Sequence, residues 1–127
     1  MNIYLDIDQV LITKDLKPAK NVYEFLKYVT DNHECYWLTT HCKGEESNTL
    51  EYLKQFLDKN CFIYLNKIKP TNWDMLKTEA IDFKKEFKWF DDYVLEAEKR
   101  ILLKNECFDK LVLVDLKSNP NQLKDFI

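Results

Sequence analysis

Short apolar runs alternate with amphipathic stretches along the whole chain. Runs of four or five mostly apolar residues predict buried strands at 2–6, 35–38, 61–65, 87–90 and 111–114. Apolar residues at helical spacing predict helices over 18–32, over about 46–58, from 71 or 72 onward, from the fourth strand to about 103, and at the C-terminus. This alternation predicts an α/β fold, a three-layer Rossmann-like domain whose five-stranded parallel sheet is covered by helices on both faces.

Prolines and capping residues indicate where three of these helices begin. Pro18 suits the first position of the first helix. Thr71 or Asn72 is expected to cap the third helix. Asn119 and Pro120 predict the cap and first turn of the last one.

Composition narrows the class of protein. A length of 127 residues predicts a single domain over 1–127. The net charge is 19 − 22 = −3 with both signs interspersed, which disfavours a general nucleic-acid-binding protein but leaves nucleic acid open as a substrate. No apolar run approaches the roughly 20 residues of a membrane span, and no secretory signal precedes the first strand. We therefore expect a cytoplasmic protein that does not enter a membrane.

The cysteines are widely scattered and have no metal-binding or redox-motif spacing. They are expected to be reduced thiols, and Cys42, which is close in sequence to the candidate site, is expected to be a core or wall residue. The four positions are Cys35, Cys42, Cys61 and Cys107.

Two aspartates at the end of the first strand give the strongest chemical signal. Asp6 and Asp8 follow an apolar run and precede another. An unpaired buried charge costs several kcal/mol, so a cation is expected beside them. Gly44 is the only glycine, which excludes a glycine-rich phosphate loop.

Other polar residues follow strands that end at the same edge of the predicted sheet. In doubly wound sheets ligands bind outside the carboxyl ends of the strands. We expect acids, hydroxyls and a lysine to converge there. The residues are Thr39 and Thr40 after the second strand, Asp91 and Asp92 after the fourth, and Lys77 before the fourth.

At four places the sequence resembles the haloacid dehalogenase superfamily of phosphohydrolases. The first motif of that family, an apolar strand followed by Asp-x-Asp-x-(Thr/Val)-Leu, is similar to IYLDIDQVL (3–11), and the second, a strand that ends in Thr or Ser, to YWLT (36–39). The third, a lysine that opens a helix, resembles KTEAI (77–81), and the fourth, a strand that ends in an acidic pair, resembles WFDD (89–92). Residues 11–21 leave room only for a short flap, and 65–71 leave none for a cap domain, so the resemblance is to the capless branch.

The resemblance implies a Mg²⁺-dependent phosphatase that acts on a phosphorylated substrate. Asp6 would be the nucleophile and form an aspartyl-phosphate intermediate. Asp8 would protonate the leaving oxygen and then deprotonate the attacking water. The Asp6 carboxylate, the Asp8 backbone carbonyl, and Asp91 or Asp92 would bind Mg²⁺.

The remaining motif residues would bind phosphate. Thr39, with Thr40 as its competitor, would donate a hydrogen bond to a phosphoryl oxygen, and Lys77 would add positive charge. Lys69 is the alternative lysine, because a Lys-Pro pair also occurs near this point in relatives. His41 follows the threonines and is expected to be an exposed loop residue, with substrate contact as the alternative.

One departure from the family pattern bears on activity. Gln9 stands where glycine is usual, and glycine is often selected for unusual dihedral angles. We expect a different local backbone, with activity that is slower or more selective. Val10, where Thr is usual, is a known alternative.

Two other functions remain open on the sequence. A phosphate- or metal-binding module with weak turnover would retain the same fold. A signalling receiver domain also combines acids, Thr and Lys, but its acid pair follows the first strand, whereas here the pair comes late, at Asp91 and Asp92.

Overall fold

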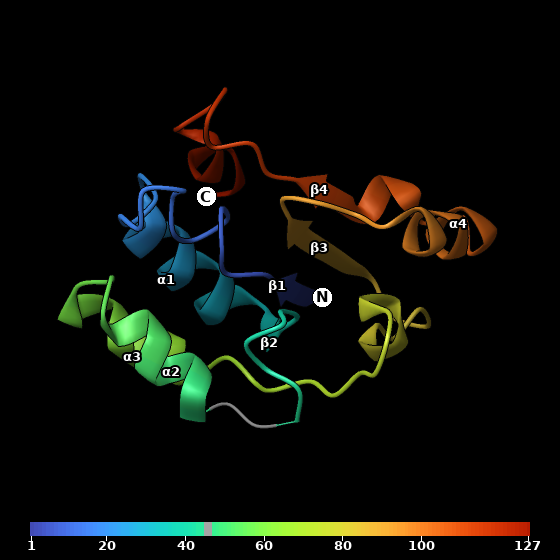
Figure 1. Cartoon of the computed structure of the whole chain (residues 1–127), viewed down its shortest axis with the longest axis horizontal. Coiled ribbons are helices and arrows are strands. Elements are labelled where there is room, and N and C mark those ends of the chain that lie inside the picture. The colour runs from blue at the N-terminus through green and yellow to red at the C-terminus, as the bar shows by residue number, and fades with distance from the viewer. Residues whose placement is uncertain (45–46) are drawn as a thin grey trace.

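A parallel sheet lies at the centre of the computed structural model, which describes residues 1–44 and 47–127 (Figure 1). Within those ranges the strands are β1 (Asn2–Leu5), β2 (Glu34–Trp37), β3 (Phe87–Asp91) and β4 (Leu111–Leu113). Their order in the sheet is β2-β1-β3-β4, and every pairing is parallel. The predicted α/β class with a parallel sheet is confirmed.

Because all strands run the same way, their carboxyl ends meet at one edge. Backbone hydrogen bonds continue just beyond the ends of β1 and β2. The Asp6 N–H donates to the Phe90 carbonyl at 2.9 Å, and the Leu38 N–H donates to the Leu5 carbonyl at 2.8 Å. The residues that follow β1 and β2 are thereby fixed against neighbouring strands.

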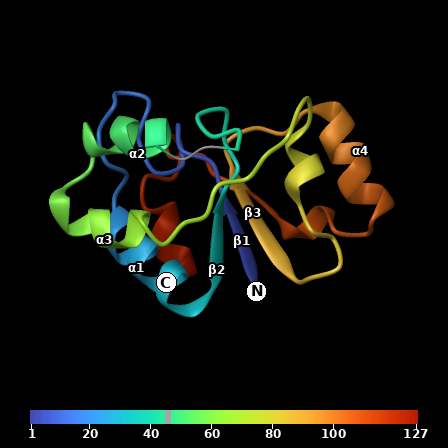
Figure 2. The same cartoon turned by 90° about the horizontal axis from the view of Figure 1, so that it is seen from below.

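Helices cover both faces of the sheet. Figure 2 shows α1, α2 and α3 on one side and α4 on the other. Among the described residues, no helix has both the length and the apolar content needed to cross a membrane. The helices are α1 (Val22–Asn32), α2 (Ser47–Lys54), α3 (Phe62–Leu65) and α4 (Glu96–Lys104), and the 3₁₀ turns are η1 (Lys59–Cys61), η2 (Lys77–Ala80), η3 (Phe108–Lys110) and η4 (Gln122–Phe126).

Alternate residues of the strands feed two separate cores. Leu5 packs in the core on the α1 side, whereas Tyr4 packs in the core on the α4 side. The first core includes Phe25, Trp37, Leu26 and Phe90, and the second includes Trp89, Phe87, Ile81 and Leu102. All four cysteines are buried and free, and Cys42 belongs to the first core, as expected.

The predicted third strand, at 61–65, is wrong, so the described part of the chain has a sheet of four strands rather than five. This segment forms the end of η1 and the helix α3. Cys61 and Leu65 are buried, whereas Ile63 between them is 62% exposed. A strand buried on both faces would also bury Ile63, while a helix places residues four apart on one buried face.

The first helix begins at Val22 rather than at Pro18. Pro18 instead forms an antiparallel bridge with Ile12 and closes a short hairpin. Asn21, directly before the helix, has a left-handed backbone with φ +64°. This hairpin, and not the preference of proline for the first turn of a helix, determines the conformation at Pro18. The predicted helix start at 46 lies outside the described residues, and that helix ends at Lys54 rather than near 58.

Two other predicted helices are much shorter than expected. Neither Thr71 nor Asn72 caps a helix, because the Thr71 hydroxyl donates to the Trp37 carbonyl, and only η2 is helical in this region. At the C-terminus, the Asn119 N–H donates to the Asp115 carbonyl in a turn, and helical structure begins at Gln122. The Thr71 hydroxyl is thus bonded to a strand, and the Asn119 N–H to a turn, and neither residue starts a helix.

Candidate active site

Three carboxylates meet at the carboxyl edge of the sheet. Asp6 follows β1, Asp91 ends β3, and Asp92 follows it. Each offers one carboxylate oxygen, and these three oxygens lie within 4.8 Å of one another. Asp6 and Asp91 are buried, whereas Asp92 is partly exposed. The structure thus brings together three of the four acids singled out in the sequence.

Lys77 provides the positive charge beside this cluster. Its Nζ lies 2.7 Å from Asp91 Oδ2 and 3.5 Å from Asp6 Oδ1. Burial alone would lower the pKa of Lys77, but the two carboxylates outweigh it and the pKa is raised. Lys69, the alternative, instead pairs with Glu34 at 2.7 Å on the exposed surface. The structure therefore places Lys77, and not Lys69, at the site.

A buried glutamate fixes Lys77 in place. Glu98 is 3% exposed, and its Oε2 accepts a hydrogen bond of 2.7 Å from the Lys77 backbone N–H. Its Oε1 accepts one of 2.9 Å from the Leu95 N–H at the start of α4. Sequence reasoning missed Glu98, because no Ser, Thr or Asp marks a cap at this helix start.

The Asp91 side chain is fixed and strongly perturbed. The Trp89 indole N–H donates to its Oδ2 and the Tyr93 backbone N–H to its Oδ1, both at 3.2 Å. Burial, followed by the negative charge of Asp6, raises the pKa of Asp91 to about 8 despite the opposing effect of Lys77. Burial also raises the pKa of Asp92. The cluster is short of positive charge, since three acids face one lysine.

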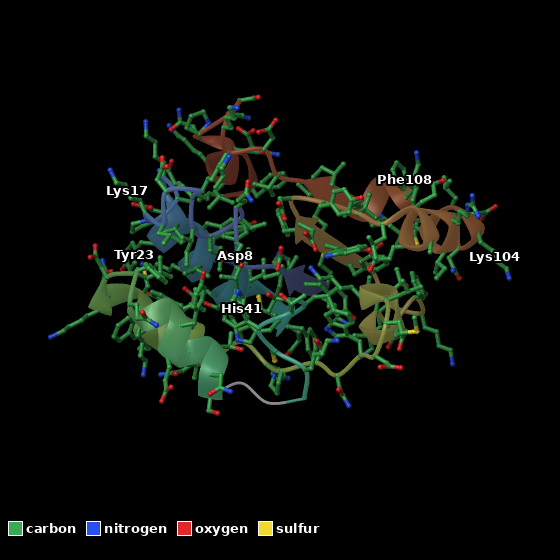
Figure 3. The ribbon with its side chains drawn as sticks, in the orientation of Figure 1. Asp8, Lys17, Tyr23, His41, Lys104 and Phe108 are labelled. Atoms are coloured by element: carbon green, nitrogen blue, oxygen red, sulfur yellow. The ribbon has the colours of Figure 1, made fainter. Side chains whose placement is uncertain are left out.

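Asp8 lies outside the three-acid cluster and has partners of its own. Its Oδ2 lies 2.8 Å from His41 Nε2, and its Oδ1 accepts a 2.8 Å hydrogen bond from the Tyr52 hydroxyl. Figure 3 shows Asp8 and His41 side by side near the centre of the molecule. The His41 and Tyr52 rings stack with centroids 4.2 Å apart. Partial burial, and then the bond to Asp8, raises the pKa of Tyr52 to about 12.

His41 lies in a loop as expected, but the expectation that it is exposed is wrong. Its side chain is 27% exposed and bonded to Asp8, because the loop after β2 folds back toward the end of β1. Tyr52, from α2, was not found in the sequence, where a tyrosine on a helix carries no signal of its own. Only the fold brings the two rings to Asp8.

The turn that follows Asp8 has an unusual backbone. The Val10 and Leu11 N–H groups both donate to the Ile7 carbonyl, which forms one helical turn. Gln9 within it has φ +62°, the left-handed region that glycine adopts without strain. Gln9 therefore costs about 1 kcal/mol here. The expected change of local backbone is not seen, because Gln9 adopts the left-handed conformation that is typical of glycine.

A pocket of about 410 Å³ opens over the acids and Lys77. Asp8 and Thr40 also line it. Thr39 is 1% exposed, and its hydroxyl accepts a 3.3 Å hydrogen bond from the His41 N–H. Of the two threonines, Thr40 is thus the one that faces the pocket.

The three-acid cluster suits a hard divalent cation. Mg²⁺ prefers carboxylate and water oxygens, and each of these residues offers a carboxylate oxygen. A bound cation would also correct the shortage of positive charge beside Asp6, Asp91 and Asp92. The Asp8 carboxylate is held by His41 and Tyr52, so only its backbone carbonyl remains as the expected ligand.

The metal-free protein should lose stability as the pH rises from about 5 to about 8. The folded chain retains a proton on Asp91 that the unfolded chain has already released, so the folded state is disfavoured as the pH approaches 8. We expect a loss of about 1–3 kcal/mol in the free energy of unfolding. Urea unfolding in a chelating buffer measures it, and Mg²⁺ should oppose the loss. Stability that rises over this interval, or an unchanged slope in Asp91→Asn, would contradict the perturbed acid.

Comparison with known proteins gives no relative from which a function could be carried over. The chemistry of the site is therefore judged from its own residues. No family model, no curated protein and no solved structure matches this chain.

Proposed function

We propose that this protein is a Mg²⁺-dependent phosphatase that hydrolyses phosphate monoesters through a phosphoaspartate on Asp6. The observation that carries this proposal is the meeting of Asp6, Asp91, Asp92 and Lys77 in one pocket. A cation bound by the acids would neutralise their charge and that of the phosphate, and would stabilise the negative charge of the transition state.

Lys77 and Asp6 define where the phosphoryl group binds. The Lys77 ammonium lies 3.5 Å from Asp6 Oδ1, close enough to contact an oxygen of a phosphorus that Asp6 attacks. Thr40 lines the same pocket and offers a hydroxyl donor. Glu98 and Asp91 hold the lysine backbone and side chain, so its charge is in place before substrate arrives.

In the first step, an Asp6 carboxylate oxygen attacks phosphorus and the bond from phosphorus to the ester oxygen breaks. Protonated Asp8 donates its proton to the departing oxygen, so the alcohol leaves neutral. The step yields the phosphoaspartate and an ionised Asp8.

In the second step, water attacks the phosphoaspartate. The Asp8 carboxylate accepts a proton from that water, and the bond between phosphorus and the Asp6 oxygen breaks. Inorganic phosphate leaves, and both aspartates return to their starting states. His41 and Tyr52 orient the Asp8 carboxyl through both steps, since each contacts one of its oxygens at 2.8 Å.

The sequence resemblance supports the same proposal. The motifs that resemble the haloacid dehalogenase superfamily supply the acids and the lysine of this pocket, and we include membership of its capless branch in the proposal. The segment after β1 forms only a helical turn and a short hairpin, in agreement with the expected flap. An uncapped site leaves one side of the pocket accessible to a substrate.

Phosphate release from a panel of phosphate monoesters, with Mg²⁺ or with a chelator, tests the proposal. We expect release about 100-fold above the chelator control, and a rise in the melting temperature with the same cation. Release that is equal in the chelator would exclude the metal-dependent mechanism. A Mg²⁺-dependent rise in melting temperature without release of phosphate from any ester would instead indicate the metal-binding module.

A further inference from the structure

The pocket over the acids has an apolar rim that the phosphoryl chemistry does not use. Met75 is 77% exposed, Tyr93 65% and Leu95 42%, yet all three line this pocket together with Trp73. Exposed large apolar side chains gathered around a concave polar site indicate a bound apolar group. The acids and Lys77 lie at the base of the pocket, and the apolar side chains lie at its rim. The two groups are therefore placed to contact different parts of one ligand.

The backbone that carries the rim is firmly held. The Glu79 carboxylate accepts hydrogen bonds from the Asp74, Met75 and Leu76 N–H groups at 3.2, 3.1 and 2.8 Å. Three backbone hydrogen bonds to one carboxylate lower the pKa of Glu79, which keeps it ionised.

On the other side of the rim, Tyr93 and Leu95 are hydrogen-bonded to residues of the candidate site. The Tyr93 N–H donates to Asp91 and the Leu95 N–H to Glu98. On the side that carries Trp73 and Met75, Lys43 Nζ lies 4.1 Å from the centroid of the Trp73 ring and donates to the Asp74 carbonyl at 3.0 Å. Met75, Tyr93 and Leu95 are thus exposed, and Trp73 partly exposed, on a preorganised backbone, which reduces the entropy lost when a ligand is bound.

We propose that the natural substrate is a phosphate monoester whose alcohol carries a planar aromatic group, and that Trp73, Met75, Tyr93 and Leu95 bind this group. This inference rests on the proposed phosphatase function. Ring faces and a thioether favour flat aromatic partners over hydroxyl-rich sugars, which need several hydrogen-bonding groups. A volume of about 410 Å³ is at the small end for ligand pockets and suits a phosphate with one ring system.

Two matched substrate pairs test the proposal, because each pair has the same type of leaving oxygen. Adenosine 5′-monophosphate is compared with ribose 5-phosphate, and benzyl phosphate with ethyl phosphate. We expect kcat/KM to be about tenfold or more higher for at least one aromatic member. Preference in the first pair alone would identify a nucleobase, and preference in the second alone a simple aryl group. Equal kcat/KM within both pairs would overturn the proposal.

Substitutions in the rim test which residues cause the higher kcat/KM for the aromatic substrate. Met75→Ala and Tyr93→Ala should each lower kcat/KM about fivefold for the aromatic member and less than twofold for its partner. Ile63→Ala and Leu103→Ala are matched controls, since these side chains are 62% and 53% exposed and are not among those lining this pocket. Equal losses on both members of a pair would overturn the assignment of the rim.

A separate measurement keeps the two proposals distinguishable. If no ester is hydrolysed, the phosphatase proposal fails. Calorimetric binding of the same pairs in Mg²⁺ then tests the proposal that the rim binds an aromatic group. Tighter binding of the aromatic member, weakened by Tyr93→Ala, would support the apolar subsite, and binding without preference, or no binding, would refute it.

Discussion

The Asp6→Asn variant should lose Mg²⁺-dependent phosphate release by about 10⁴-fold or more while it remains folded. The amide has nearly the same shape as the carboxylate, but it cannot serve as the nucleophile. Asp6 lies at the end of β1, where its backbone N–H donates to the Phe90 carbonyl, and the substitution leaves that bond in place. Steady-state release from the best ester of the panel and the melting temperature measure the two halves of this prediction.

The stability of this variant follows from the same contacts. Removal of the Asp6 charge relieves repulsion with Asp91, whose pKa Asp6 helps to raise, but it also removes an attraction to Lys77 at 3.5 Å. These effects oppose each other, so we expect a change in melting temperature of only a few degrees. Asp31→Asn is a matched control, since Asp31 pairs with Lys67 at 3.3 Å outside the pocket. Full turnover in Asp6→Asn would exclude Asp6 as the nucleophile.

The sequence predicted the acids of the site because the strand ends determine their positions. Apolar runs located β1 and β3, and a parallel sheet brings Asp6 and Asp91 to one edge regardless of what connects the strands. Lys77 was singled out by its position before the fourth strand and by its resemblance to a motif, although the helix expected around it is reduced to the turn η2. The bond from its N–H to Glu98 compensates for the missing helix.

The failures have one physical cause in common. Short segments carry too little local information to determine their own conformation, and tertiary contacts decide it. Segment 61–65 is apolar enough for a strand, but Cys61 and Leu65 are buried while Ile63 between them is exposed, which fits a helix and not a strand. The partners of Asp8 come from a loop and from α2, and no spacing in the sequence connects His41 with Tyr52.

The sequence did not predict that His41 and Tyr52 contact Asp8. These contacts should have a clear effect on the kinetics. Asp8 follows β1, its side chain is 49% exposed, and its two carboxylate oxygens contact His41 and Tyr52, so we expect its orientation to depend on these two residues. Side chains that fix a general acid act through that acid alone. Their effect on the first step, which kcat/KM reports, should be largest where the departing oxygen needs a proton, whereas the second step needs Asp8 for every ester.

Asp8→Asn should lower kcat/KM by about 10²–10⁴-fold for alkyl phosphates. The loss should be about tenfold smaller for p-nitrophenyl phosphate, because p-nitrophenolate leaves without a proton. His41→Gln and Tyr52→Phe should each lower kcat/KM for alkyl phosphates about tenfold, and add no further loss in the Asp8→Asn background. Tyr64→Phe, which removes a hydroxyl from a tyrosine that stacks edge-on with Tyr23, is the matched control. Equal losses on both classes of ester, or additive effects in the double variants, would show that these residues support the fold rather than the acid.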